Sequence, residues 1–153
     1  MTAIISDCGK YRYTLERAWS RDPRYLMYIM LNPSTADAEK DDPTIRRCIG
    51  FAKLLGYDGI LVGNLYAFRA TNPKELRNQG NIVGPDNDKH LLALANRAQQ
   101  IVCAWGQPGP EIWRARDVRQ LLSYPLYALG FTKGGYPRHP LMLPKTARPI
   151  EFS

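Results

Sequence analysis

An apolar run that ends in asparagine and proline places the strongest constraint on how this chain folds. Residues 25–31 read Tyr-Leu-Met-Tyr-Ile-Met-Leu, and Asn32-Pro33 follow at once. A run of this length and composition, closed by a turn dipeptide, predicts a buried β-strand. Because ligands of open α/β sheets bind beyond the carboxyl ends of strands, Asn32, Ser34 and Thr35 are candidate site residues. A turn without chemistry is the alternative interpretation.

Length and composition favour a single domain with a polyanionic partner. The chain has 153 residues, 44% of them hydrophobic, which suits one core. It carries 21 Lys and Arg against 14 Asp and Glu, a net charge of +7, and its pI is near 9.5. No apolar run approaches the ~20 residues of a membrane helix, and no secretory leader is evident. We therefore expect a cytoplasmic monomer without membrane contact, whose domain spans residues 1–153.

Strand and helix signals alternate along the chain. Asp42-Pro43 have the residue types of a helix start, and apolar residues recur at helical spacing as far as Leu55. Strands are expected at 11–19 (on the sheet edge), 25–31, 59–65, 101–105 and 124–129, and helices at about 43–55, 86–98 and 110–122. A strand, a helix and a strand in this order imply a right-handed crossover and a parallel pair. The predicted fold is a three-layer α/β sandwich around a central, mostly parallel sheet of about four strands.

The segment 130–153 is rich in glycine, proline and basic residues, which predicts an irregular C-terminal loop or tail. It carries His139, one of only two histidines in the chain. A histidine in a loop is more often a surface residue than a catalytic one, so this position alone assigns no role.

Several familiar chemistries lack their sequence signals. The chain has no glycine-rich phosphate loop, no dinucleotide fingerprint and no nucleophile elbow, so we expect no cofactor. The cysteines Cys8, Cys48 and Cys103 are odd in number and widely separated, so neither a zinc site nor a disulfide framework is expected, and no metal site is assigned. The acidic segment 37–42 has two interpretations, a base or divalent-ion site and a solvated loop with one helix cap.

Five short motifs resemble those of a bacterial and phage family known as domain of unknown function 1643. They are Leu31-Asn32-Pro33-Ser34-Thr35-Ala36, Asp42-Pro43-Thr44-Ile45-Arg46-Arg47, Gly63-Asn64-Leu65, Trp105-Gly106 and His139-Pro140-Leu141. The resemblance covers nearly all of residues 11–144. It implies no activity, because the function of that family is unknown.

The same landmarks, in the same order, are remotely similar to the uracil-DNA glycosylase superfamily. Ile29-Met30-Leu31-Asn32-Pro33 resembles the Gly-Ile-Asn-Pro-Gly motif whose residues place the attacking water. Val62-Gly63-Asn64 stands where a Leu-Leu-Asn motif reads the flipped base, and Ala104-Trp105-Gly106 resembles Leu-Trp-Gly. His139-Pro140-Leu141 resembles a His-Pro-Ser-Pro loop whose histidine contacts the base carbonyl, but it has leucine where serine is usual.

This second resemblance implies a nucleobase glycosylase that hydrolyses the N-glycosidic bond of a flipped base, in DNA in preference to RNA. Repair or removal of a modified base is the implied role. Asn32 and His139 would be catalytic, which requires both to lie at one cleft. Asn64 would bind the base, and Tyr66 or Phe68 would stack on it. The residues expected to contact nucleic acid are Ser34, Thr35, Arg46, Arg47, Arg69, Lys133, Arg138 and, as a wedge, Leu141.

Two other functions are left open by the sequence. A non-catalytic nucleic-acid-binding module is one, because asparagine is a poor general base. A metal-dependent hydrolase of a phosphorylated small molecule is the other, in which the acidic loop would hold the metal. Neither the base nor the choice between nucleic acid and a free nucleoside follows from the sequence.

Overall fold

The apolar run at residues 25–31 supplies the central strand of the fold. In the computed structural model, which describes residues 1–111 and 113–152, β3 (Tyr25–Met30) pairs in parallel with β4 (Gly59–Asn64) on one side and with β5 (Ala98–Cys103) on the other. Every residue of β4 is buried, as is every residue of β3 after Tyr25. Strands covered on both faces have this continuous apolar composition. The expected parallel pair is confirmed.

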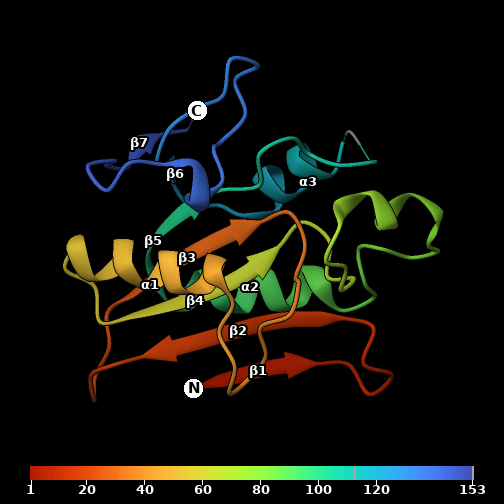
Figure 1. Cartoon of the computed structure of the whole chain (residues 1–153), viewed down its shortest axis with the longest axis horizontal. Helices are drawn as coiled ribbons and strands as arrows, with labels where there is room; N and C mark the ends of the chain where they lie inside the picture. The colour runs from red at the N-terminus through yellow and green to blue at the C-terminus, as the bar shows by residue number, and fades with distance from the viewer. Residues whose placement is uncertain (112, 153) are drawn as a thin grey trace.

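The described residues form one seven-stranded sheet in the order β1-β2-β4-β3-β5-β6-β7 (Figure 1). The remaining strands are β1 (Thr2–Ile5), β2 (Arg12–Ala18), β6 (Leu126–Ala128) and β7 (Ile150–Glu151). The pairs β4–β3, β3–β5 and β5–β6 are parallel. The pairs β1–β2, β2–β4 and β6–β7 are antiparallel.

Our predicted fold class, with a central, mostly parallel sheet of about four strands, is wrong. The sheet has seven strands, and half of its pairings are antiparallel. The N-terminal residues form β1, so β2 lies between two strands and is not on the edge. The segment 130–153 also contributes β7, which hydrogen-bonds to β6. Strands as short as β1 and β7 carry too few residues for an alternating pattern to be recognised.

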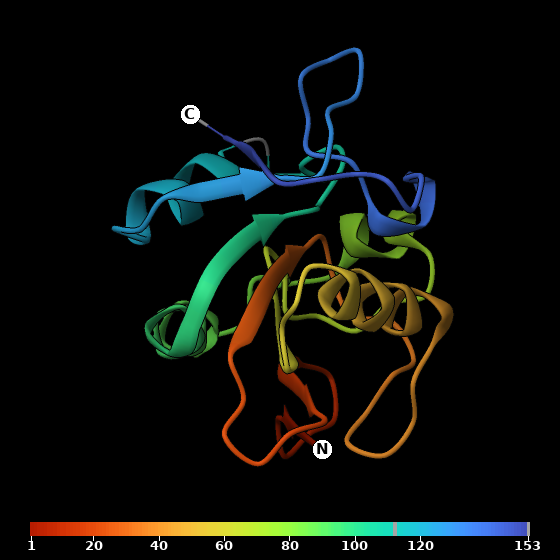
Figure 2. The ribbon, with the colours of Figure 1, turned by 90° about the vertical axis from the view of Figure 1, so that its left-hand side faces the viewer.

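Helices cover both faces of the sheet (Figure 2). The helix α1 (Pro43–Leu54) packs one stripe of side chains against one face, with Ile45 and Phe51 among them. On the other face, α2 (Asn87–Arg97) and α3 (Arg114–Leu121) share a second core cluster. Two short 3-10 helices, η1 (Pro73–Asn78) and η2 (Pro140–Met142), lie in the connections. The two clusters hold the sheet between them.

The predicted start of α1 is confirmed in atomic detail. Asp42 has an extended backbone, and its Oδ1 accepts a hydrogen bond from the backbone N–H of Ile45 at 2.9 Å, while Pro43 occupies the first helical turn. By contrast, Asp86 precedes α2 without a side-chain hydrogen bond to the helix. α3 begins at Arg114, later than expected. The capped end of α1 therefore has a fixed position above the carboxyl ends of β3 and β4.

Candidate functional site

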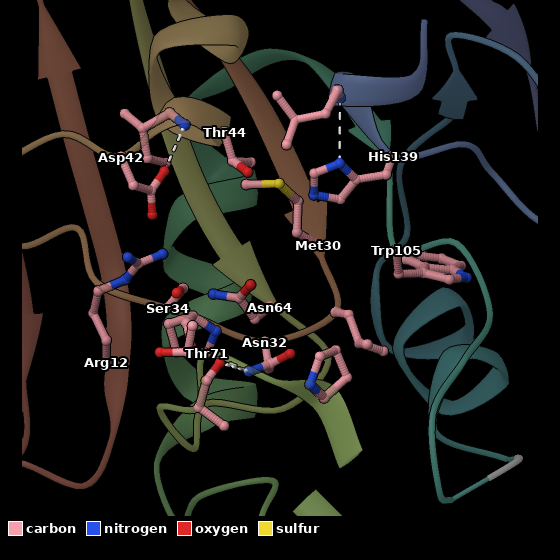
Figure 3. Close-up of a pocket in the computed structure, with 16 residues that line it drawn as sticks. Arg12, Met30, Asn32, Ser34, Asp42, Thr44, Asn64, Thr71, Trp105 and His139 are labelled. Carbon is pink, nitrogen blue, oxygen red and sulfur yellow. Dashed lines mark hydrogen bonds between the residues drawn. The ribbon is translucent and has the colours of Figure 1, made fainter. Parts of the chain in front are cut away.

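A cavity of about 300 Å³ opens at the carboxyl ends of β3 and β4, beside the start of α1 (Figure 3). Its size lies at the small end of the range for ligand pockets, which suits a ligand no larger than a nucleotide. It is lined by Arg12, Met30, Leu31, Asn32, Pro33, Ser34, Asp42, Thr44, Ile45, Asn64, Ala70, Thr71, Pro73, Trp105, His139 and Leu141.

The register of two strands brings the asparagines together. Met30 in β3 lies opposite Asn64 in β4. Beyond the strands the pairing continues, because Leu65 N–H donates to Met30 O at 2.8 Å and Tyr66 N–H donates to Leu31 O at 3.0 Å. Asn32 and Asn64 thus line one cavity. The expectation that Asn32 and His139 share a cleft is confirmed, although 107 residues (139 − 32) separate them in sequence.

Asn64 is the most unusual side chain of the cavity. It is 1% exposed, and neither its Nδ2 nor its Oδ1 has a hydrogen-bond partner among the described residues. Figure 3 places its amide at the centre of the lining residues. A buried polar group without a partner costs about 1–3 kcal/mol. Such an amide can both donate to and accept from one edge of a ligand.

Asn32 is held firmly by its neighbours. Its Nδ2 donates to Ala70 O at 2.8 Å and to Pro33 O at 3.1 Å. Both N–H bonds of the amide are therefore engaged, and Oδ1 is the atom left to act as an acceptor. An acceptor fixed in this way can orient a water molecule, whose O–H would donate to it.

His139 directly precedes η2 and lines the cavity on the side opposite Asn32 (Figure 3). Its Nδ1 accepts a hydrogen bond from Leu141 N–H at 3.2 Å, which leaves the proton of the neutral ring on Nε2. Burial lowers the pKa of His139, and the charge of Asp42 opposes this shift. The ring is accordingly neutral at pH 7, with one N–H donor available to a ligand.

Asp42 and Arg12 are the only acidic and basic residues among the described residues that line the cavity, apart from His139. One carboxylate oxygen of Asp42 accepts the hydrogen bond that caps α1, and the other makes no hydrogen bond to any residue described. Arg12 comes from β2, is 2% exposed, and donates from Nη1 to Ala36 O at 3.0 Å. Burial lowers the pKa of Arg12 to about 10, so the guanidinium is charged at neutral pH.

The other predicted base-binding residues do not line this cavity. Tyr66 is fully buried in the core, and its hydroxyl donates to Pro108 O at 2.6 Å. The ring of Phe68 packs edge to face on Tyr11. Trp105, which is 3% exposed, is the only Phe, Tyr or Trp of the described chain that lines the cavity. Stacking of a flat ligand would fall to Trp105.

The predicted contacts to nucleic acid fall into separate groups. Ser34 and Leu141 line the cavity, whereas Thr35 is exposed and does not. Lys133 and Arg138 line a neighbouring hollow that also includes His139. A different group, Arg46 and Arg47 with Lys53 and Lys145, surrounds a hollow on α1. Arg69 is half-buried and does not line the cavity, but its charge lies near enough to Arg12 to lower the pKa of that residue.

Sequence reasoning missed several of the lining residues. The sequence predicts only an edge strand for the segment that contains Arg12, because nothing in the sequence marks a buried arginine. The sequence predicts Asp42 as a helix cap. That Asp42 also lines a cavity could not be predicted, because this depends on where the helix starts relative to the sheet. Thr71 has no signal in the sequence, and Thr44 has one only as a member of the Asp42–Arg47 motif, which assigns it no role. Trp105 had one, since it follows a buried strand together with a glycine.

The described residues contain neither a metal-binding cluster nor a membrane-spanning helix. Among residues 1–111 and 113–152, no three His, Cys, Asp or Glu side chains gather where they could hold a metal ion. No helix in the same residues is long and apolar enough to cross a bilayer.

Comparison with known families identifies the family of this chain. The model of a family described as a protein of unknown function, DUF1643, matches residues 12–141. The chain belongs to this family. All 16 cavity residues lie within the matched part, so the cavity is a feature of the DUF1643 region. No curated protein and no solved structure matches the chain.

The unpaired amide of Asn64 leads to a prediction about stability. Replacing it with leucine, which is of similar size, removes a buried polar group that has no partner. We expect Asn64→Leu to keep the free energy of unfolding or to raise it by about 1 kcal/mol, measured by urea denaturation at unchanged m-value.

Asn87→Leu is the matched control, because Asn87 is equally buried and its Oδ1 is also unpaired, but its Nδ2 donates to Asn64 O at 3.0 Å and to Leu65 O at 3.2 Å. Its loss should lower the free energy of unfolding by about 1–3 kcal/mol. Equal destabilisation by the two variants would mean that Asn64 serves the fold and not a ligand.

Proposed function

We propose that this protein is an N-glycosylase that removes a flipped base from nucleic acid, in DNA in preference to RNA. The observation that carries the proposal is the buried and unpaired amide of Asn64 in a cavity large enough to hold a base. A flipped base is held by hydrogen bonds to one edge and by stacking on its face. Asn64 and Trp105 have the chemistry for these two contacts.

The reaction needs an oriented water and a stabilised leaving group. The oxygen of water forms a bond to the glycosidic carbon of the sugar, and the carbon–nitrogen bond breaks with its electron pair going to the base. The transition state resembles an oxocarbenium ion, with negative charge growing on the base. Oδ1 of Asn32 would orient the water, and Nε2–H of His139 would donate to the base as charge develops on it.

Asp42 removes the main objection to catalysis in this cavity. Asparagine is too weak a base to take a proton from water, but Asp42 supplies a carboxylate, the only one among the described lining residues. The proton released by the attacking water would pass to this carboxylate, whose negative charge would also favour the cationic sugar.

Charge and exposed apolar side chains support a nucleic-acid partner. The chain carries a net charge of +7, and Lys133 and Arg138 line the neighbouring hollow that also includes His139. Leu141 is 49% exposed and Met142 is 66% exposed on the adjacent η2. Apolar side chains at such a position can fill the gap that a flipped base leaves in the stack.

The proposal is tested with a panel of oligonucleotides that carry one uracil, thymine mismatch or modified base, as single strands and as duplexes. Alkaline cleavage detects abasic sites, and mass spectrometry detects the free base. Release of one base by the purified protein supports the proposal. Binding without release indicates a non-catalytic module, and activity only with added divalent metal on phosphorylated small molecules indicates the third function.

The role of Asp42 gives a prediction that separates catalysis from folding. Asparagine caps helices about as well as aspartate, so Asp42→Asn keeps the start of α1 but removes the negative charge. We expect the single-turnover rate of base release to fall by at least ~100-fold, with the melting temperature within a few degrees of the wild type.

Glu39→Gln is the control for Asp42→Asn, because Glu39 lies exposed in the same acidic loop and outside the cavity. Its base-release rate should match that of the wild type. An unchanged rate in Asp42→Asn would exclude the carboxylate from the reaction.

A second prediction concerns the phosphate backbone. Affinity for oligonucleotides should fall steeply with salt, and Arg138→Ala should reduce the slope of log K against log salt by about one. Arg21→Ala is the control, because Arg21 is exposed between β2 and β3, at the end of the sheet opposite the cavity. Binding that does not depend on salt, or equal slopes for both variants, would contradict a phosphate contact at Arg138.

A further inference from the structure

Three arginines are buried among the described residues, namely Arg12, Arg17 and Arg114, and Arg12 differs from the other two. Arg17, also on β2, pairs with Asp41 at 2.8 Å and donates to several backbone carbonyls, Glu16 O at 3.0 Å among them. Arg114 pairs with Asp88 at 2.8 Å and donates from Nε to Leu65 O. A guanidinium removed from water needs this kind of compensation.

Arg12 lacks this compensation. The only hydrogen bond from its side chain to a described residue goes to Ala36 O. Its Nε is buried without a partner, and its guanidinium forms no ion pair with any residue described. Asp42 lies near enough to favour its charge, but no salt bridge or hydrogen bond joins the two side chains. Arg69 and Arg17 add further positive charge around it.

The position of Arg12 places its unpaired guanidinium where a ligand could bind it. Its side chain extends from β2 toward the interior of the cavity, between Asp42 and Ser34 (Figure 3). Arg12 and Arg17 reach the same loop, at Ala36 O and Asp37 O respectively. The donors of Arg17 are thus engaged, whereas Arg12 on the same strand keeps donors that are available to a ligand in the cavity.

We propose that Arg12 binds an anionic oxygen group of the ligand, a carboxylate on the base or a phosphate of the nucleotide. This rests on the proposed function, since it names the class of substrate that the same cavity accepts. The planar fork of a guanidinium matches the two oxygens of a carboxylate or phosphate, and a hydrogen bond between charged groups is about twice as strong as one between neutral groups. The hydroxyls of Ser34 and Thr44, which also line the cavity, can donate to the same group.

The test compares matched neutral and anionic probes by calorimetric titration of the full-length protein. The pairs are uracil with 5-carboxyuracil, and deoxyuridine with deoxyuridine 5′-monophosphate, and inorganic phosphate is titrated alone. We expect the anionic member of one pair to bind at least ~10-fold more tightly than its neutral partner. Preference within the first pair identifies the carboxylate as the source, and preference within the second pair, or binding of phosphate alone, identifies the phosphate. If neither pair shows a preference and phosphate does not bind, the proposal is wrong.

Arg12→Met tests the residue itself. We expect the variant to bind both members of a pair equally, while its urea midpoint stays at or above that of the wild type, because an uncompensated charge has been removed. Arg12→Lys, which keeps the charge but loses the fork, should retain a reduced preference. A preference that persists in Arg12→Met would overturn the assignment.

Arg17→Met is the matched control, since it removes a fully paired arginine from the same strand. It should lower the urea midpoint and leave the ratio of anionic to neutral affinities unchanged in the folded protein. The results also distinguish failure of this inference from failure of the proposed function. Base release without any charge preference keeps the glycosylase and rejects this inference, whereas a preference that depends on Arg12, without base release, keeps the anion site and rejects the reaction.

Discussion

The parallel register of β3 and β4 is the constraint on which the candidate site depends. It sets Met30 opposite Asn64, and the hydrogen bonds of Leu65 and Tyr66 to the chain beyond β3 extend the alignment past the strand ends. A slip of one residue would turn Asn64 to the other face of the sheet. Both faces are packed, one by α1 and the other by α2 and α3, so such a slip would disrupt two cores at once. The two asparagines are therefore positioned by the most heavily buried part of the protein.

The cavity contrasts with the rest of the polar interior. Elsewhere single atoms such as Arg47 Nε and Asn87 Oδ1 are also buried without a partner, but the same side chains donate to described carbonyl oxygens. Arg17 is surrounded by acceptors, and Nδ2 of Asn87 ties α2 to the end of β4. At the cavity, both polar atoms of Asn64 and the Nε of Arg12 have no described partner. Unpaired groups of this kind reduce stability, and clustered at one cavity they are the expected signature of a site that awaits a ligand.

Sequence reasoning succeeded where a signal is local and failed where it depends on pairing. Asp42-Pro43 marked the start of α1, and the run before Asn32 marked β3, because a cap and an apolar run need only neighbouring residues. The parallel pair followed from element order. β1 and β7 were missed, since such short strands exist only through their partners. In the site, residues at strand ends such as Asn32 and Asn64 could be found. Arg12 could not, because burial of a charged side chain on β2 is decided by the distant loop that covers it.

The most direct test of the account is whether a base contacts the amide of Asn64. The side-chain N–H₂ resonances of Asn64 and Asn87, assigned by comparison with the two leucine variants, can be followed by NMR while free nucleobases and their 5-carboxy forms are added. The account predicts that one base shifts the Asn64 resonances in a saturable way and leaves those of Asn87 nearly unchanged. If no base shifts Asn64, or if both asparagines shift together, the cavity does not hold a base against this amide and the account is contradicted.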